Sequence, residues 1–250
     1  MLRVLAYLWA FFGAYWIVFA PAFSSKSLRQ TNLQTLKLGF LAVMFFLLLW
    51  KAQSISPVWI VVLGLAWTMV ALYWVAPRKE THSGEYRFYR LLRLLIGALT
   101  FALLFWQKMG IGFLGQRFLP RNFAVMVMGF VVTLFGLGVT AWARVHLGQY
   151  WSDKVVIQPE HRLVRTGPYA RVRHPIYFGV LLAIAGTTLV VGEWRALTSL
   201  LLMSINYTVK ARKEDKILSQ CFGEEFRSYQ QNAGMLLPHF GPRPTNRQST

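Results

Sequence analysis

Acidic residues and cysteines are scarce in this sequence. Its 250 residues include nine Asp and Glu against 27 Lys and Arg, and one cysteine, Cys221. A single cysteine excludes a disulfide framework and a thiolate metal site, and its apolar neighbours predict a packed side chain. A net charge of +18 is common in nucleic-acid-binding proteins. Here the cations lie between apolar runs rather than along one face, which argues against nucleic acid and favours contacts with lipid headgroups.

The motifs of several enzyme classes are also missing. The chain has no G-x-G-x-x-G, no Walker loop, no H-E-x-x-H and no G-x-S-x-G. No Ser or Cys has an obvious base partner, and no metal site is predicted. Direct transfer from an activated cofactor is the simplest chemistry left. The first apolar run has no small-residue cleavage site, so we interpret it as a retained span rather than a signal peptide.

Apolar residues, by contrast, are abundant. They make up 55% of the chain, with ten Trp and nineteen Phe, and the mean hydropathy is +0.41. This excess predicts an all-α, multi-spanning transmembrane helical bundle of about seven spans, because each span needs roughly 20 apolar residues. The candidate spans are Val4–Ala22, Leu38–Trp50, Pro57–Ala76, Leu94–Trp106, Phe123–Trp142, Pro175–Gly192 and Ala196–Tyr207.

The cations support seven spans and give them an orientation. If the C-terminus is cytoplasmic, 21 of the 27 Lys and Arg lie in cytoplasmic segments and 6 lie outside. The positive-inside rule favours this arrangement, although five spans with two re-entrant or surface helices remain an alternative. The sequence therefore predicts a multi-pass membrane protein with a cytoplasmic C-terminus.

Polar residues are concentrated in the last third of the chain. We expect N-terminal transmembrane helices over residues 1–143, and a cofactor-binding region over 144–240. This second region contains a tight helical hairpin around Glu193-Trp194 and a charged cytosolic helical tail. Residues 241–250 are expected to form a disordered tail.

The richest segment is HRLVRTGPYARVRHPIYFG, His161–Gly179. Pro175 suits the first position of a helix, which places Arg173 and His174 at its N-terminus and Tyr177 on the same face as His174. Free backbone N–H groups beside these cations predict a site for a carboxylate or phosphate. The alternative is a basic loop that contacts lipid phosphates.

Small residues follow this segment at helical spacing. Gly179, Ala183 and Gly186 lie four and three residues apart along one face. Such a stripe lets a second helix approach closely, and packing is its preferred interpretation.

Two carboxylates stand out in the tail helix. Glu214 falls on a face otherwise made by Leu218 and Cys221, with Asp215 beside it. A buried carboxylate is costly unless it is paired or binds a ligand. We therefore expect either a salt bridge to Arg171 or Arg173, or a carboxylate that binds ligand hydroxyls such as those of a ribose. Gly223 is expected to end this helix.

These residues resemble the isoprenylcysteine carboxyl methyltransferase family and related membrane phospholipid methyltransferases. The family signature runs G-P-Y-x-x-x-R-H-P-x-Y-x-G, a helical hairpin, a Glu-Glu pair, F-G-x-x-Y/F-x-x-Y and a late Pro. The matching residues are Gly167, Pro168, Tyr169, Arg173, His174, Pro175, Tyr177, Gly179, Glu214, Asp215, Phe222, Gly223, Phe226, Tyr229 and Pro238. The likeness covers about residues 141–238. It departs at Asp215, which stands where the family has its second Glu and reaches one methylene less far.

The resemblance implies S-adenosylmethionine as the cofactor, bound between the His174 helix start and the tail. Arg173, His174 and Tyr177 are the implied catalytic residues. The implied cofactor-binding residues are His161, Gly167, Pro168, Tyr169, Arg173, His174, Pro175, Tyr177, Glu214 and Asp215. Arg173 and His174 suit the methionine carboxylate, Glu214 the ribose and the Tyr177 ring the sulfonium. Such a transfer depends on positioning more than on a covalent nucleophile.

The substrate stays open at this point. A lipophilic acceptor such as an isoprenylcysteine carboxylate fits the family, and aminophospholipids and small thiols are alternatives. Membrane sterol reductases carry a similar R-H-x-x-Y element but use a nicotinamide cofactor, and they usually have Asn before the Tyr, where this chain has Ile176. A non-enzymatic membrane scaffold is the remaining alternative. No obligate protein partner is predicted.

Overall fold

The computed structural model describes residues 1–19, 87–106, 110–147 and 163–239. Within these ranges all regular structure is helical, with two isolated β-bridges. The chain divides into two compact units, residues 3–92 and residues 93–250 together with the first two residues. The predicted spans Leu38–Trp50 and Pro57–Ala76 lie outside the described residues.

In the first unit the described helix is α1, Leu2–Phe19, which corresponds to the predicted span Val4–Ala22. Trp9 and Phe12, one turn apart, meet edge to face with ring centroids 6.3 Å apart. Helix α4, Arg87–Phe105, begins in this unit and continues into the second one, so it starts two turns earlier than the predicted span Leu94–Trp106.

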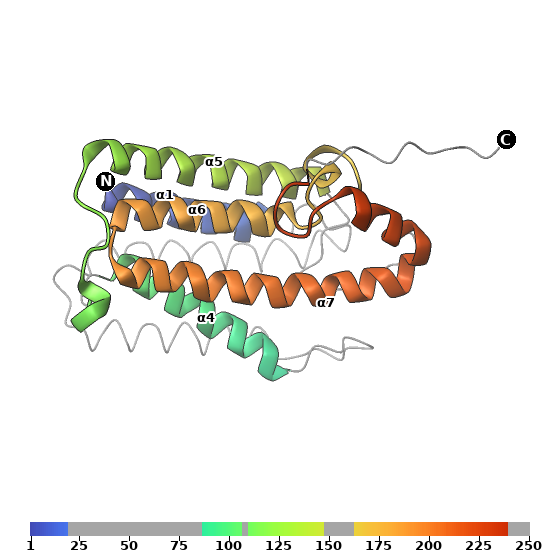
Figure 1. Cartoon of the computed structure of the whole chain (residues 1–250), viewed down its shortest axis with the longest axis horizontal. Helices are drawn as coiled ribbons and strands as arrows, with labels where there is room; N and C mark the ends of the chain where they lie inside the picture. The colour runs from blue at the N-terminus through green and yellow to red at the C-terminus, as the bar shows by residue number, and fades with distance from the viewer. Residues whose placement is uncertain (20–86, 107–109, 148–162, 240–250) are drawn as a thin grey trace. The chain divides into compact units, whose positions relative to one another are not determined.

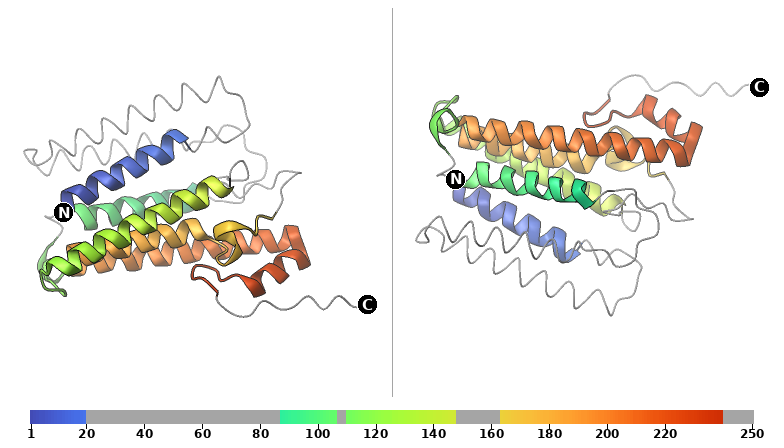
Figure 2. Two further views of the ribbon diagram at one scale, coloured as in Figure 1. Left: turned by 90° about the horizontal axis from the view of Figure 1, so that it is seen from above. Right: turned by 90° about the horizontal axis from the view of Figure 1, so that it is seen from below.

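The second unit is built around α5, Phe123–Leu147, α6, Pro175–Val191, and α7, Trp194–Asn232. These three helices run alongside one another in Figures 1 and 2. Among the described helices, α5 is long and apolar enough to cross a membrane, while Leu95–Phe105 and Pro175–Val191 are apolar but shorter.

Helices α5 and α6 touch through small residues. A Cβ added at Gly136 would lie 2.6 Å from the carbonyl oxygen of Gly179, so only a hydrogen fits there. The hydroxyl of Thr133 on α5 donates across the interface to the carbonyl of Ala183 at 3.2 Å. The expected packing stripe Gly179, Ala183 and Gly186 is therefore confirmed, and its contact is with α5.

The hairpin between α6 and α7 is as tight as predicted. Gly192 ends α6 in the left-handed conformation at φ 66°, and Glu193 is the N-cap of α7. The 3₁₀-helix η3, Gly112–Gly115, lies against this turn, where Phe113 stacks on Trp194 with centroids 5.0 Å apart.

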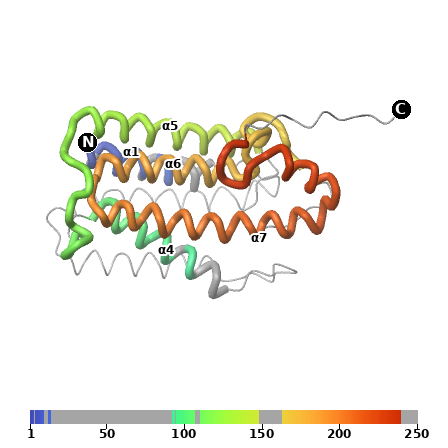
Figure 3. Tube along the Cα trace, viewed as in Figure 1, coloured from blue at the N-terminus to red at the C-terminus, as the bar shows by residue number. Residues whose placement is uncertain are grey.

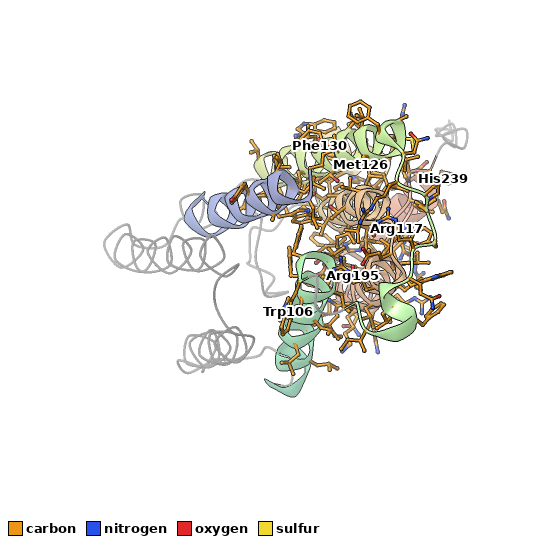
Figure 4. All side chains as sticks on the ribbon, turned by 90° about the vertical axis from the view of Figure 1, so that its left-hand side faces the viewer. Trp106, Arg117, Met126, Phe130, Arg195 and His239 are labelled. Carbon is orange, nitrogen blue, oxygen red and sulfur yellow. The ribbon has the colours of Figure 1, made fainter. Side chains whose placement is uncertain are left out.

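Arg117, Glu193 and Arg195 form a polar group at this end, here named the turn cluster. Figure 4 labels its two arginines. Arg195 is 2% exposed. It pairs with Glu193 at 2.6 Å and donates to the carbonyls of Leu103 and Leu104 at 2.6 and 3.2 Å. Arg117 donates to the carbonyl of Val191 at 2.9 Å. The two arginines thus cap the last turns of α4 and α6.

Helix α7 is interrupted at Gly223, whose φ of 51° and ψ of −121° are not helical. Helix α7 therefore joins the predicted span Ala196–Tyr207 to the tail in one continuous helix up to this glycine. Beyond it the chain turns back towards the beginning of α6, as the tube in Figure 3 shows. Phe226, Tyr229 and Ala233 are buried there, together with the partly buried Leu163 and Leu218.

Candidate active site

The segment before α6 is held by backbone hydrogen bonds to the residues that follow α7. The N–H groups of Arg173 and His174 donate to the carbonyls of Gly234 and Met235 at 2.8 and 3.1 Å. Pro175 occupies the first helical turn, and His174 is the N-cap. Both side chains predicted to bind an anion are therefore fixed at the α6 N-terminus, as the sequence indicated.

His174 connects this helix start to both tail carboxylates. Its Nε2 lies 2.9 Å from Oδ1 of Asp215, and its Nδ1 lies 3.3 Å from Oε2 of Glu214. The imidazole is 7% exposed. With a carboxylate oxygen at each ring nitrogen, both nitrogens act as donors only when the ring is protonated.

Arg173 is held at several points. Its Nη2 and Nε donate to Oδ2 of Asp215 at 2.9 and 3.2 Å. Its Nη1 donates to the carbonyl of Gln230 at 3.3 Å and to that of Ala233. One guanidinium thus joins the α7 carboxylate to the end of α7, in a fork geometry that Lys does not offer.

Aromatic rings and a lysine complete the group. Tyr177 donates from its hydroxyl to Oε1 of Glu214 at 2.7 Å and stacks on His174 and Tyr207, with centroids 5.4 and 4.7 Å apart. Lys210 lies 3.8 Å from the same Oε1, and its ammonium is 5.1 Å from the Tyr177 ring centroid. We name the following residues the His174 cluster: Arg173, His174, Tyr177, Lys210, Glu214 and Asp215.

Burial and charge oppose one another in this cluster. Burial lowers the pKa of His174, but hydrogen bonds and charges from Asp215 and Glu214 outweigh it, so the pKa is raised above 6.5. Burial raises the pKa of both Glu214 and Asp215, but nearby cations outweigh it. His174 and Lys210 lower the pKa of Glu214 below its ordinary value, and His174 and Arg173 do the same for Asp215. The contacts within the cluster thus favour the protonated form of His174 and the ionised forms of the two carboxylates.

The Gly-Pro-Tyr element forms η5, Gly167–Ala170, which packs against α5. Gly167 has φ 57°, and a Cβ there would lie 2.7 Å from the His146 ring. Pro168 and Tyr169 are buried; Tyr169 donates to the carbonyl of Ala143 at 3.4 Å. Its own carbonyl accepts from Tyr229 at 2.6 Å. These residues have structural contacts in the chain, so their expected contact with a cofactor stays a prediction.

The sequence analysis missed three residues of this region. Lys210 and Tyr207 face Tyr177, and Arg144, 4% exposed, is buried near Tyr169. Lys210 stands four residues before Glu214, a spacing typical of helical ion pairs, which was the available signal. Arg144 follows an apolar run and looked like a membrane-flanking cation.

One expectation about the tail needs correction: Cys221 was expected to be packed but is exposed. Asp215 is less exposed than Glu214 and binds both Arg173 and His174. Its supporting part beside Glu214 in ligand binding stays a prediction. The salt bridge expected for this pair exists, with Arg173 as the partner. His161 lies outside the described residues, so its role stays a prediction.

The His, Asp and Glu side chains come together without metal-ligand geometry. Within the described ranges, no group of three or more His, Cys, Asp or Glu is arranged to hold a metal ion. The carboxylates instead face cations and a phenol. The arrangement suits binding of an organic ligand that offers both charges and hydroxyls.

A known protein family matches the segment of the chain that contains this site. Residues 127–220 match the family model of the Isoprenylcysteine carboxyl methyltransferase (ICMT) family. All six members of the His174 cluster lie within these residues. The resemblance inferred from the signature is therefore confirmed.

Curated relatives match over similar, partial lengths. Methanethiol S-methyltransferase of Pseudomonas deceptionensis is 40% identical over 77 residues, 30% of this chain and 28% of that protein. The uncharacterized protein YpbQ of Bacillus subtilis is 36% identical over 86 residues, 33% of this chain and 49% of that protein. The chain thus spans less than half the length of these two relatives.

One solved structure was also found to be similar. It is the eukaryotic intramembrane Ras methyltransferase ICMT, determined without a monobody. The likeness covers 94% of this chain and 85% of that one, with a TM-score of 0.47 and 18% identity.

Proposed function

Because residues 127–220 match the model of the isoprenylcysteine carboxyl methyltransferase family, we propose that this chain is an integral-membrane, S-adenosylmethionine-dependent methyltransferase. Its acceptor is a lipophilic molecule such as an isoprenylcysteine carboxylate. The observation that carries the proposal is His174, which binds Glu214 of α7 through one ring nitrogen and Asp215 through the other. A buried cluster of titratable groups with perturbed pKa values is typical of a functional site.

The side chains present fit this cofactor. Its methionine end needs cations for a carboxylate, which Arg173, His174 and Lys210 supply. Its ribose needs acceptors for two hydroxyls, which Glu214 supplies. A sulfonium is attracted to aromatic faces, and Tyr177 stacks between residues of α6 and α7. The donor and acceptor set therefore suits the carboxylate, the ribose and the sulfonium of the ligand.

When bound, such a cofactor would supply a methyl group on a cationic sulfur for direct transfer to the acceptor. The chain's part is to orient the reactants and to exclude water. Tyr177 and His174, locked by Glu214 and Asp215, are rigid enough to hold one geometry. No residue has to form a covalent intermediate.

The same contacts favour an acceptor that is already nucleophilic. Both nitrogens of His174 face carboxylates, which raise its pKa and favour the protonated ring. Glu214 and Asp215 have lowered pKa values and bind cations. None of the three is therefore suited to remove a proton from an ammonium group. This supports a carboxylate acceptor over an aminophospholipid.

A small thiol is the second candidate acceptor. The 40% identity to methanethiol S-methyltransferase over 77 residues favours it. A thiol ionises near neutral pH without a strong base. The substrate test therefore includes a prenylated cysteine, an aminophospholipid and a small thiol, each with labelled cofactor and protein purified in detergent. We expect transfer to the carboxylate or the thiol; transfer to the phospholipid alone would reject the acceptor argument.

Cofactor identity is tested separately by calorimetry. We expect S-adenosylmethionine and S-adenosylhomocysteine to bind, and a nicotinamide dinucleotide to bind far more weakly. Preferential binding of the dinucleotide would move the chain to the sterol reductase class. Failure of all three ligands to bind would favour a scaffold without enzymatic activity.

We also propose that the site and the C-terminus are cytoplasmic, on the basis of the cation asymmetry. Tags placed near residues 85, 160 and 245 test this in intact cells. Each is expected to be protected from an impermeant label added outside. Labelling of the 160 region from outside would overturn the orientation, and with it the seven-span arrangement.

A further inference from the structure

The three cations of the His174 cluster are held with very different strength. Arg173 has four hydrogen bonds, to Asp215 and to two main-chain carbonyls. His174 has a carboxylate at each nitrogen. Lys210 has one ion pair, to Glu214 at 3.8 Å, which is beyond hydrogen-bond distance. Its other contact is the face of the Tyr177 ring.

The charges of the cluster do not balance. With His174 protonated, Arg173, His174 and Lys210 carry three positive charges, and Glu214 and Asp215 carry two negative ones. The Lys210 side chain is 19% exposed and those of Arg173 and His174 are 11% and 7% exposed. A surplus charge so far removed from water is stabilised by a further anion. The excess positive charge of the cluster would therefore be balanced by one ligand carboxylate.

The geometry decides which cation meets that carboxylate. If Arg173 turned to a ligand, Asp215 and the carbonyls of Gln230 and Ala233 would each lose a donor. If Lys210 turned, Glu214 would keep the hydroxyl of Tyr177 and the imidazole of His174. A lysine also has a flexible four-carbon stem with a single point charge, so it changes partners more easily than a clamped guanidinium.

We propose that Lys210 is the residue that pairs with the carboxylate of the ligand, and that Arg173 is a positioning residue. This assignment rests on the proposed function, in which the ligand is S-adenosylmethionine with its amino-acid carboxylate. Arg173 acts through others: it holds Asp215, which holds His174, and it ties both to the end of α7. The departure of Lys210 leaves Glu214 one partner short, which suits it to accept a ribose hydroxyl.

Two probes separate the roles. S-adenosylhomocysteine carries the carboxylate, whereas 5′-methylthioadenosine shares its adenosine and thioether but lacks the amino-acid group. In Lys210→Met we expect the affinity for S-adenosylhomocysteine to fall about ten- to hundredfold, the range for a charge-assisted hydrogen bond. The affinity for methylthioadenosine is expected to stay the same. Lys210→Arg, which keeps the charge, is expected to restore most of the lost affinity.

The matched control is Lys216→Met, which removes a charge from an exposed position on the same helix. It is expected to leave both affinities unchanged. Arg173→Met is expected to weaken both probes by the same factor and to lower the melting temperature in detergent, as a positioning residue does. Should Lys210→Met not fold, Lys210→Gln replaces it in the same comparison.

Three results would overturn the assignment. Equal weakening of both probes in Lys210→Met would mean that Lys210 acts through Glu214, and no weakening at all would remove it from the site. Selective loss of S-adenosylhomocysteine in Arg173→Met, with Lys210→Met neutral, would return the carboxylate to Arg173. If the unmodified protein binds neither probe, the proposed function itself fails. This outcome differs from the three above, in which the unmodified protein binds and only the assignment of Lys210 fails.

Discussion

The two ends of the α6–α7 hairpin each contain buried charges, but the partners differ. In the turn cluster, Arg117 and Arg195 donate mainly to main-chain carbonyls, and Glu193 is the one carboxylate. In the His174 cluster, two carboxylates, an imidazole and a phenol bind one another through side chains. A carbonyl fixed in a helix cannot change partner, whereas a carboxylate can.

The difference separates structure from function within one hairpin. Arginines that cap helix ends lower the free energy of the folded chain and have no chemistry to offer a ligand. In the His174 cluster Lys210 can change partner at modest cost, because Glu214 keeps the hydroxyl of Tyr177 and the imidazole of His174. Variants in the turn cluster are therefore expected to change stability alone. Variants in the His174 cluster, at the other end of the hairpin, are expected to change ligand affinity as well.

Arg195→Met at the turn is expected to have the largest effect on stability. It leaves the carbonyls of Leu103 and Leu104 and the carboxylate of Glu193 without their donor. Removing one partner of a buried pair costs about 3–5 kcal/mol of unfolding free energy. Unfolding in mixed detergent measures this loss, with Arg121→Met, at an exposed position, as the control. Affinity for S-adenosylhomocysteine per folded molecule is expected to be unchanged. A loss of affinity as large as the loss of stability would show that the turn cluster also contributes to ligand binding.

Asp215→Asn in the His174 cluster is expected to lower stability less than Arg195→Met, by about 2–3 kcal/mol of unfolding free energy. The amide keeps some hydrogen bonds but leaves the guanidinium of Arg173 and the imidazolium of His174 without their shared counter-charge. The same unfolding measurement applies. Ligand affinity is expected to fall less than in Glu214→Gln. A larger loss of affinity than of stability would make Asp215 a direct ligand contact.

Local sequence patterns predicted much of this hairpin. The hairpin around Glu193-Trp194, the helix start at Pro175 and the helix end at Gly223 were all predicted, and all three are confirmed. Each is a backbone property of one or two residues, so it can be read without knowledge of distant contacts.

Which side chains meet depended on information that helical spacing does not contain. Glu214 and Asp215 differ by one position, and the sequence could not decide which would be buried deeper. Cys221 is exposed and lies two residues before the break at Gly223. Lys210 reaches Tyr177 through a flexible stem, which no pattern fixes.

Glu214→Gln tests the ligand side of the comparison. If Glu214 accepts a ribose hydroxyl, the variant is expected to weaken binding of S-adenosylhomocysteine by about 1.5–3 kcal/mol. The loss of stability is expected to be smaller than in Asp215→Asn, since a glutamine oxygen still accepts from Tyr177. Calorimetry and unfolding on the same preparation measure both. Unchanged affinity would leave Glu214 as a structural ion-pair partner like Glu193.

The pH dependence of stability is expected to show the most gradual effect, and to come from the His174 cluster alone. The folded-state pKa of His174 is raised, so its contribution is complete below about 6.5, the unfolded value, and is lost as the pH rises through the folded value. The pKa values of Glu214 and Asp215 are lowered, so their contribution is present above about 4 and is lost as the pH falls through the folded values. Stability is therefore expected to be greatest between mildly acidic and neutral pH, with a slope above it of at most about 1.4 kcal/mol per pH unit for the one proton of His174. His174→Gln is expected to flatten this alkaline limb, whereas Arg195→Met lowers the whole curve without changing its shape. An alkaline limb that persists in His174→Gln would place the titrating group outside the cluster.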